Sequence, residues 1–431
     1  MICCDSVSQV SVRVIGSGGM EHAVGWKLSQ SPHVGKIYCI PGNGGTAITE
    51  KCENINLKDY FSMARFAHEN NVSLTVVGPE QPLVKGIVNL FSYHNLRIFG
   101  PGKEAAQLEG NKAYAKNFMS EYGVPTPQFR IFTDPEEATR YVERAGPVYV
   151  KASGLAGGKG ALDGRTVDLA KQAIRRIMIE REFEYAGDEV VIEQYLHGEE
   201  ASCMALINSD ANIITPLIPS QDHKKLGEND TGQNTGGMGA YAPTTLITED
   251  LDRRIMSDVL LRTLHGLQDR GISYNGVIYP GLMISDGIPF VLEDGVRFGD
   301  PETQSVMPLL ESDLYEVLNN VKDGRKPELR WKNGYAVCVV LASDGYPDPS
   351  SYEIGKLITG LEKQKDGVII FHAGTNYDGN FYTSGGRVLG VTGSGQTIEQ
   401  ARDRAYDAIE SIFFDNRIFR GDIGRRELLR I

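Results

Sequence analysis

The stretch VSVRVIGSGG, residues 10–19, decides how the first part of this chain folds. Its valines at 10, 12 and 14 and its isoleucine at 15 predict a strand, and the glycines that follow predict a tight turn into a helix over 21–29. Strand, glycine loop and helix in this order are typical of a parallel α/β unit. The loop fits a phosphate seat at a helix N-terminus and equally a structural turn, because the third glycine of the dinucleotide-binding fingerprint is absent.

The same alternation of strand and helix continues after this unit. Further strands are expected at 36–40, 74–77 and 97–99, with a helix at 60–70. Polar loops rich in glycine follow two of these strands, at 41–46 and 78–80. Because the carboxyl ends of parallel strands lie at one edge of a sheet, we expect these loops to meet the first glycine loop in a shared ligand pocket.

A second glycine loop, residues 154–160, follows a strand expected at 148–151. Lys151 ends that strand, Lys159 lies inside the loop, and Lys112 opens an earlier expected helix. The loop lacks the GK[ST] ending of a P-loop. Flexible glycine backbone beside lysines is typical of a flap over nucleotide phosphates, although a solvent-exposed loop with two surface lysines would give the same pattern.

Three later stretches also carry polar groups in patterns that favour binding. A strand expected at 189–194 leads into EQYL and two glutamates, a pattern suited to an adenine and a ribose. The polar stretch 220–239 is too long for a plain connector, which indicates function or disorder. Within it, we expect His223 to make structuring hydrogen bonds rather than act as a base. The charged stretch EDGVRFGDPETQ, 293–304, follows an apolar strand and indicates a ligand site.

The composition is that of a globular chain with several domains. It has 431 residues, of which 41% are hydrophobic and 23% charged, and a net charge of −12. This charge argues against general binding to nucleic acid or to an anionic membrane. No apolar run reaches the length of a membrane helix, and the N-terminal extension with Cys3 and Cys4 has no signal-peptide pattern. The six cysteines show no CxxC pair, so we expect reduced thiols in a cytoplasmic protein.

Seven motifs lie along the chain in a fixed order. They are GxGGxEHA at 16–23, PGNxGT at 41–46, GPExPL at 78–83, QLEGxKAxAKxFM at 107–119, QDHKxxGxxDTGxNTGGMGAY at 221–241, RFGDPETQ at 297–304 and HAGT at 372–375. In these motifs the chain resembles the phosphoribosylamine–glycine ligase (glycinamide ribonucleotide synthetase) family of ATP-grasp enzymes. The resemblance runs nearly end to end and implies ATP-dependent ligation of glycine to 5-phosphoribosylamine through a glycyl phosphate, in purine biosynthesis.

The resemblance also implies a domain plan. We expect an α/β and α+β protein with an N-terminal Rossmann-like substrate domain at 1–110. ATP-grasp domains are expected at 111–325, including a flap subdomain at about 128–195, and a small α+β domain at 334–431. The expected partners are small molecules, namely ATP, glycine and 5-phosphoribosylamine, with Mg²⁺ or Mn²⁺ as metal. A free enzyme and one part of a multifunctional purine-pathway protein both remain open.

The family's site residues can be carried over position by position. The expected catalytic residues are Arg297, Asp222, which would bind the glycine ammonium, and Lys151. The expected ATP-binding residues are Lys112, Lys151, Gly157, Gly158, Lys159, Glu193, Tyr195, Leu196 and Glu200. The expected phosphoribosylamine-binding residues are Gly18, Gly19, Asn43, Gly45 and Glu80.

The metal site departs from the family pattern. The family has Glu-x-Asn before RFGDPE, whereas this chain has Glu293, Asp294 and Gly295. Successive side chains of a strand point to opposite faces, so Asp294 would need a bulge or twist to join Glu293 on one metal. We therefore expect a weakened site.

Three further departures accompany it, and one of them is Asp344, which stands where the family usually has Gly before Gly345. Met20 replaces the family's usual Arg and would remove a charge near the phosphoribosyl pocket, and Asp163 on an expected apolar strand would carry a burial penalty unless it is solvated or paired. A weakened or inactive nucleotide-binding homologue is therefore a second hypothesis. A nicotinamide oxidoreductase, suggested by the first glycine loop, is a third.

Overall fold

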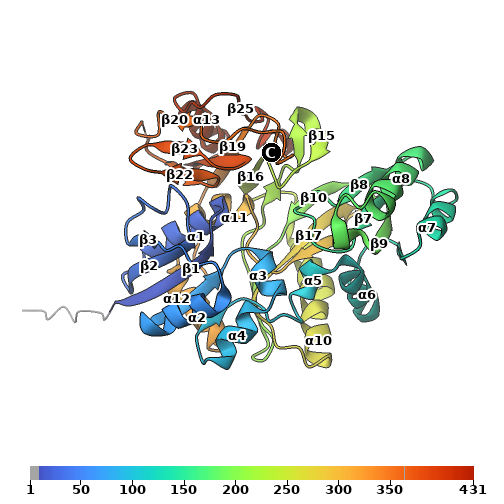
Figure 1. The fold of residues 1–431 in the computed structure, drawn as a ribbon, viewed down its shortest axis with the longest axis horizontal. Helices are drawn as coiled ribbons and strands as arrows, with labels where there is room; N and C mark the ends of the chain where they lie inside the picture. The colour runs from blue at the N-terminus through green and yellow to red at the C-terminus, as the bar shows by residue number, and fades with distance from the viewer. Residues whose placement is uncertain (1–8, 364) are drawn as a thin grey trace, which may run out of the picture.

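A parallel sheet forms the N-terminal part of the computed structural model, which describes residues 9–363 and 365–431 (Figure 1). In spatial order its strands are β3 (Cys52–Asn54), β2 (Val34–Pro41), β1 (Val10–Gly16), β4 (Val72–Val77) and β5 (Ile98–Phe99). Its helices are α1 (Gly19–Ser29), α2 (Tyr60–Glu69), α3 (Glu80–Val84) and α4 (Ile87–Tyr93). All neighbouring strands are parallel, as expected. Cys3 and Cys4 lie outside the described residues, so the expectation for their segment stays a prediction.

A small antiparallel sheet projects from the right of the molecule in Figure 1. Its strands, in spatial order, are β6 (Phe129–Phe132), β9 (Val190–Gln194), β7 (Val148–Ala152) and β8 (Ala161–Gly164). The sheet packs against α7 (Pro135–Val142) and α8 (Val167–Ile174), which continues as a π-helical turn, Arg175–Ile179. The glycine loop 154–160 connects β7 to β8, so it lies at the end of this antiparallel strand pair.

A second antiparallel sheet lies between this projection and the parallel sheet. Its strands are β10 (Glu199–Ser202), β17 (Asn275–Ser285), β11 (Ala205–Asn208) and β12 (Ile213–Pro216), with β18 (Ile288–Gly295) paired to β17. The helices of this region are α5 (Gln107–Gly110), α6 (Lys112–Tyr122), α9 (Glu249–Arg254), α10 (Leu261–Asp269), α11 (Glu302–Val306) and α12 (Leu314–Lys322). A bulge interrupts the β17–β18 pairing, because Gly281 faces Glu293 while Leu282 faces Val291.

The C-terminal part is built on a third sheet, at the top of Figure 1. Its strands are β13 (Gln221–Asp222), β16 (Gly239–Ala242), β19 (Tyr335–Ser343), β24 (Arg387–Gly395) and β21 (Val368–His372), with β25 (Arg417–Ile418) beside β19. A smaller sheet consists of β20 (Leu357–Ile358), β23 (Phe381–Thr383) and β22 (Thr375–Tyr377). The helices are α13 (Ile398–Ile409) and α14 (Arg425–Arg430).

The polar stretch 220–239 is more regular than the sequence suggested. Its ends are β13 and β16, which pair with each other, and β16 also pairs with β19. Between them, β14 (Lys225–Gly227) and β15 (Thr231–Asn234) form a hairpin. The position of β16 is set by its backbone pairing with β19, which lies far away in the sequence. Such pairing does not require a hydrophobic periodicity in the local sequence.

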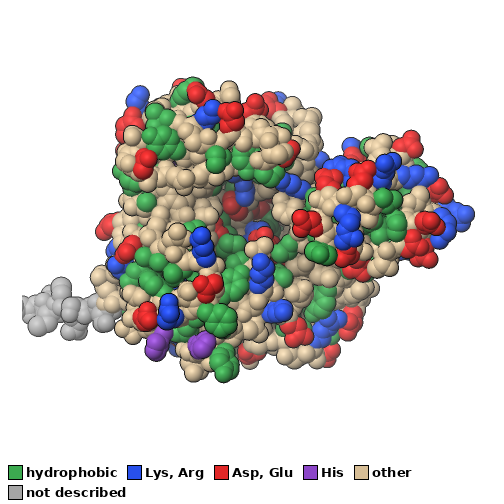
Figure 2. Space-filling view, viewed as in Figure 1, with side chains coloured by type: hydrophobic (Ala, Val, Ile, Leu, Met, Phe, Trp, Pro, Cys, Tyr) green, Lys and Arg blue, Asp and Glu red, His purple; other side chains and the backbone are tan. Residues whose placement is uncertain are grey.

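Shared cores hold these parts together. One buried cluster contains Val12 of β1, Val277 of β17 and Ala336 of β19, so it spans the N-terminal, central and C-terminal sheets. The parts surround a hollow with basic and acidic side chains at its floor, which Figure 2 shows facing the viewer. Among the described residues, no helix is long and apolar enough to cross a membrane.

Candidate functional site

The loops at the carboxyl ends of β1, β2 and β4 meet, as the sequence predicted. The backbone N–H of Gly42 donates to Gly16 O at 3.2 Å, and Asn43 Nδ2 donates to Ser17 O at 2.9 Å. A Cβ on Gly78 would overlap the carboxyl group of Glu21, so only glycine allows this close approach. The loops therefore form one edge of the hollow.

Asn43 and Gly45 connect this edge to the C-terminal part. Asn43 Nδ2 donates to His372 O at 2.8 Å, and Asn43 Oδ1 accepts from Gly45 N at 2.9 Å. A Cβ on Gly45 would overlap the ring of His22, which itself accepts from His372 N at 2.8 Å. Both residues thus hold two parts of the chain together, and their expected contact with phosphoribosylamine stays a prediction.

The N-terminus of α1 already has an internal carboxyl group, that of Glu21. Gly18 N donates to Glu21 Oε2 at 2.7 Å, and burial, with Asp300 nearby, raises the pKa of Glu21 to about 7. A Cβ on Gly19 would lie 2.6 Å from Gln304 Nε2, so Gly19 makes room for that side chain. A phosphate at the expected seat must therefore bind beside Glu21.

Arg387, which the sequence did not reveal, brings a positive charge to this seat. It comes from β24, and its Nη2 lies 3.0 Å from Asp300 Oδ2. It also donates to Gly236 O at 2.6 Å, which ties the polar stretch to the C-terminal sheet. No sequence signal pointed to Arg387, because it lies far along the chain from the motifs around it.

Two lysines and one glutamate form a buried ionic cluster at the base of the flap sheet. Glu193 lies between Lys151, at 2.9 Å, and Lys116, at 3.2 Å, and the side chain of Glu193 is 2% exposed. Lys151 Nζ also donates to Leu292 O at 3.2 Å. Burial lowers the pKa of Lys116 to about 8. The cluster fixes the ammonium of Lys151, and it uses the carboxylate of Glu193 for that purpose, so the expected contact of Glu193 with adenosine stays a prediction.

The other expected nucleotide groups lie around this cluster. Lys112 begins α6, and burial lowers its pKa, with Glu293 and Lys151 close enough to influence its charge. Gly157 and Gly158 have φ of 59° and 76°, and both are exposed. Lys159 follows them in the same loop. This loop reaches over the hollow, since a Cβ on Gly158 would lie 3.7 Å from Thr235 O.

The strand end after β9 forms the far wall of this region. Tyr195 stacks on Tyr149, with ring centroids 5.4 Å apart, and its backbone N–H donates to Pro147 O at 3.1 Å. Leu196 beside it is half-buried. This wall offers an aromatic surface and backbone groups of the kind that hold a planar base.

An acidic group lies at the floor of the hollow. The pKa of Asp222 is raised to about 8, mainly by burial, with Glu302, Glu200 and Glu293 contributing to the rise and Lys224 opposing it. Lys224 Nζ lies 3.0 Å from Glu200 and 3.4 Å from Glu293. Lys224 is the main reason why the pKa of Glu293 is lowered to about 2. A further cation beside Asp222 would favour the charged form of its carboxyl group.

Arg297 connects the N-terminal loops to this floor. Its guanidinium lies 3.6 Å from Glu80 and 3.2 Å from Glu109. Glu109 also accepts from Val296 N at 2.7 Å, so it fixes the backbone next to Arg297. The structure therefore brings together Arg297 and Glu80, which the sequence assigned to different roles, and adds Glu109 to them.

The structure separates Asp294 from Glu293. The Glu293 side chain is 48% exposed and contacts Lys224, whereas Asp294 is 6% exposed. Burial raises the pKa of Asp294 to about 7, with Lys116 opposing and Glu109 adding to the rise. The bulge in β18 precedes Glu293, so it does not turn Asp294 to the same face. Glu293 fits a metal ligand, and the expected help from Asp294 is not supported.

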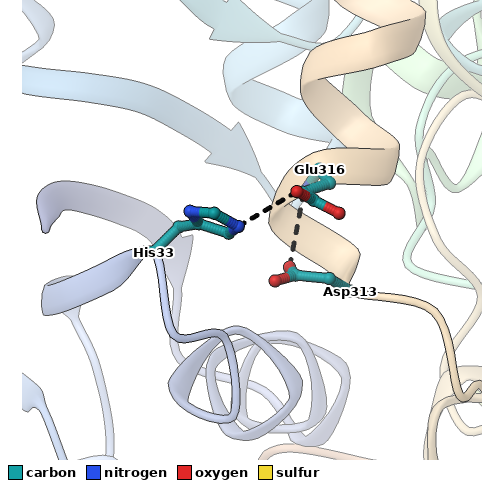
Figure 3. Close-up of side chains that lie close together, drawn as sticks. All are labelled: His33, Asp313 and Glu316. Carbon is teal, nitrogen blue, oxygen red and sulfur yellow. Dashed lines mark hydrogen bonds and ion pairs between the residues drawn. The ribbon is translucent and has the colours of Figure 1, made fainter. Parts of the chain in front are cut away.

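One other group of potential metal ligands lies away from the hollow, beside the C-terminal end of α1. Figure 3 shows His33, Asp313 and Glu316, whose ligand atoms all lie within 4.8 Å of one another. Asp313, however, caps α12 by accepting from Tyr315 N at 2.9 Å, and Glu316 pairs with His33 at 3.0 Å. A cation is disfavoured at a helix N-terminus, so these contacts account for the group without a metal.

The charged hollow between a glycine-rich parallel sheet and a flap sheet agrees with what comparison finds. Models of phosphoribosylglycinamide synthetase match residues 10–109 (N domain), 110–303 (ATP-grasp (A) domain) and 336–426 (C domain). The chain belongs to this family. The phosphoribosylamine–glycine ligases of Ralstonia nicotianae and Vibrio vulnificus are 45% and 44% identical to it over 98% of this chain, covering 100% and 99% of those proteins.

Solved structures support the same family and fold. The crystal structure of phosphoribosylamine–glycine ligase from Thermotoga maritima has a TM-score of 0.83 and 34% identity, covering 96% of this chain and 100% of that one. A biotin carboxylase domain from Hydrogenobacter thermophilus, solved with MgADP, has a TM-score of 0.72 and 17% identity, covering 95% and 91%, and shows the fold alone. The expected ATP-grasp fold is thereby confirmed, and the oxidoreductase hypothesis has no support.

Two departures from the family pattern have a structural account. Met20 is 3% exposed and packs in a buried apolar cluster, and the expected loss of a charge near the phosphoribosyl pocket stays a prediction. Asp163 is partly exposed and lies 2.6 Å from Arg165. Its negative charge is therefore solvated and paired, and the burial penalty considered for it does not arise.

Proposed function

We propose that the chain ligates glycine to 5-phosphoribosylamine with ATP, through a glycyl phosphate, and releases glycinamide ribonucleotide, ADP and phosphate in purine biosynthesis. The observation that carries this proposal is the meeting of buried lysines with an acidic floor in one hollow. Lysines suit phosphate oxygens, and the acids around Asp222 suit an ammonium group. Relatives that match nearly the whole chain are phosphoribosylamine–glycine ligases.

The nucleotide would lie between the flap sheet and the floor. Lys151 is held in place by Glu193 and Leu292 O, so its ammonium is a fixed charge for phosphate oxygens. The exposed glycines of the loop 154–160 can approach the phosphates closely. We infer Mg²⁺ as the metal, held by Glu293 with phosphate oxygens and water. When bound, it neutralises phosphate charge during transfer. Mn²⁺ in its place stays a prediction.

The glycine ammonium would pair with Asp222. Before a further cation joins Lys224, burial and the neighbouring acids keep the pKa of Asp222 at about 8, so its carboxyl is largely protonated at neutral pH. An ammonium group at this position would favour the charged form and release the proton. Arg297, held by Glu80 and Glu109, retains N–H donors that can face the acyl phosphate or the carboxylate.

The test measures ADP release by the purified chain with Mg²⁺. We expect release only when glycine and phosphoribosylamine are both present, and we expect Lys151→Met to abolish it. Lys171→Met is the matched control, because Lys171 is a partly exposed lysine paired to Glu143 at 2.7 Å. ATP binding without any ADP release would support the weakened or inactive homologue, which the comparisons do not favour. A cytoplasmic location and a place within a multifunctional protein stay predictions.

A further inference from the structure

The polar stretch that carries Asp222 and Lys224 also has a face turned away from the hollow. His223 lies between these two residues and is 1% exposed. Neither of its ring nitrogens has a hydrogen-bond partner among the described residues, so the expectation that it makes structuring hydrogen bonds is wrong. A buried imidazole without partners is costly, because both nitrogens lose their contacts with water. This position therefore calls for a partner from outside the chain.

A cavity of about 230 Å³ lies beside this ring, between the β14–β15 hairpin and the C-terminal segment. His223, Asp230, Asp422, Arg425 and Arg426 are among its lining residues. Arg425 is exposed, so the cavity is open to solvent there. Its volume is large enough for a small ion together with water.

The charges around this cavity are unequally satisfied. Arg420 Nε lies 2.8 Å from Asp422 Oδ1, and Arg420 Nη1 lies 3.1 Å from Asp230 Oδ1. Asp230 also pairs with Arg426. Arg425, in contrast, makes no ion pair with any residue that the structure describes. Both acids are thus already paired, while one arginine is unpaired and another shares its partner.

The positive charges around the cavity affect the pKa of His223. The pKa of His223 is lowered to about 3, mainly by burial, with Arg420 and Arg426 contributing and Asp422 opposing. The ring is therefore neutral, with one N–H available to donate. An anion is the ligand that unpaired arginine and a free imidazole N–H both favour.

We propose that this cavity is a binding site for a small tetrahedral oxyanion of the phosphate class, held by Arg425, Arg426 and a ring N–H of His223. The site is separate from the catalytic hollow and does not depend on the function proposed above. The bound ion would connect the C-terminal segment to the backbone that carries Asp222 and Lys224. It would thereby stabilise the hairpin beside the hollow.

The test is calorimetric titration of the full chain with inorganic phosphate at constant ionic strength, with ADP saturating the nucleotide site. We expect Arg425→Gln to weaken binding at one phosphate site about tenfold, the effect of losing one charge-assisted hydrogen bond. Arg65→Gln is the matched control, since the Arg65 side chain is 73% exposed on α2 and lies outside the cavity. Equal phosphate binding by wild type and Arg425→Gln would overturn the proposal.

A second variant separates ligand binding from a purely structural role. Phosphate should raise the melting temperature of wild type but raise that of His223→Phe much less. In phosphate-free buffer, His223→Phe should melt no lower than wild type, because the ring nitrogens make no bond within the described chain. A crystal structure in phosphate should show a tetrahedral ion beside His223. Water alone in that position, or an equal phosphate effect in both proteins, would refute the site.

Discussion

Restoring a side chain at Gly295 is the most direct perturbation of the proposed metal site. In Gly295→Asn, the new Cβ would lie 3.1 Å from Tyr279 Cδ1 and 3.4 Å from Tyr279 Cβ. The tyrosine cannot withdraw freely, because its hydroxyl bonds to Ser202 Oγ at 2.8 Å and to Glu302. The overlap is a few tenths of an ångström against a normal carbon contact, so we expect a loss of about 1 kcal/mol, at the low end for overpacking.

The same variant should gain metal affinity. Residues 293 and 295 lie on one face of β18, so an Asn amide oxygen would lie beside Glu293, where Asp294 cannot reach. One added interaction with a charged group is worth about 1.5–3 kcal/mol, which corresponds to roughly tenfold to a hundredfold tighter Mg²⁺ binding. Stability and metal affinity should therefore move in opposite directions.

Gly295→Ala separates these two effects, since it adds the Cβ without an oxygen. Urea unfolding should give a similar loss for the Ala and Asn variants. Calorimetry of ATP binding over a series of Mg²⁺ concentrations should show a gain for Asn alone, with a matching change in the Mg²⁺ dependence of ADP release. If Ala and Asn give the same Mg²⁺ dependence, the account of the metal site is wrong. If neither variant loses stability, the packing argument is wrong.

Three other substitutions test the charge assignments. Glu193→Gln leaves Lys116 and Lys151 without their shared partner, and urea unfolding should show a loss of about 3–5 kcal/mol. Asp294 has a folded pKa of about 7 against an ordinary 3.8, so the native state holds its proton longer and wild-type stability falls as pH rises between these values. In Asp294→Asn this pH-dependent loss of stability, which amounts to up to about 4 kcal/mol in wild type, should be absent. Urea unfolding of both proteins at pH 5 and pH 8 measures it. A stability difference between the two proteins that is the same at both pH values would contradict the assignment. Asp163→Asn should change the unfolding free energy by less than about 1 kcal/mol, and a larger loss would show that its surface ion pair matters more than such pairs usually do.

The sequence predicted the N-terminal sheet well because every local signal there agreed. The strands over 10–16 and 72–77 are rich in valine and mostly buried, so they are recognisable as strands although Ser11, Arg13 and Ser73 interrupt their apolar residues. The polar stretch 220–239 gave the opposite result. Its strands β13 and β16 are specified by pairing with each other and with β19, a contact that lies about a hundred residues away in sequence and leaves no local pattern.

The candidate site divides in the same way. Lys151 and Arg297 lie near or after the ends of apolar strands, which is why their motifs pointed to a site, whereas Asp222 was expected only from the family resemblance. Lys116 lies one helical turn after Lys112, so a helical projection of α6 would have placed both on one face. Arg387 had no such signal, since its position depends on how the C-terminal sheet packs against Asp300.

Alternation along extended backbone accounts for the two results that differ most from expectation. Asp294 is turned away from the metal ligand Glu293 because neighbouring side chains of β18 face opposite sides, and the bulge comes too early to change this. The same rule places His223 behind Asp222 and Lys224. In β18 this alternation turns the carboxylate of Asp294 away from the metal site. In the polar stretch it places Asp222 and Lys224 on one side of the backbone and His223 on the other. A ligand on the His223 face would therefore contact the segment that carries Asp222 and Lys224 from the side opposite the hollow, so it need not enter the hollow to stabilise their backbone.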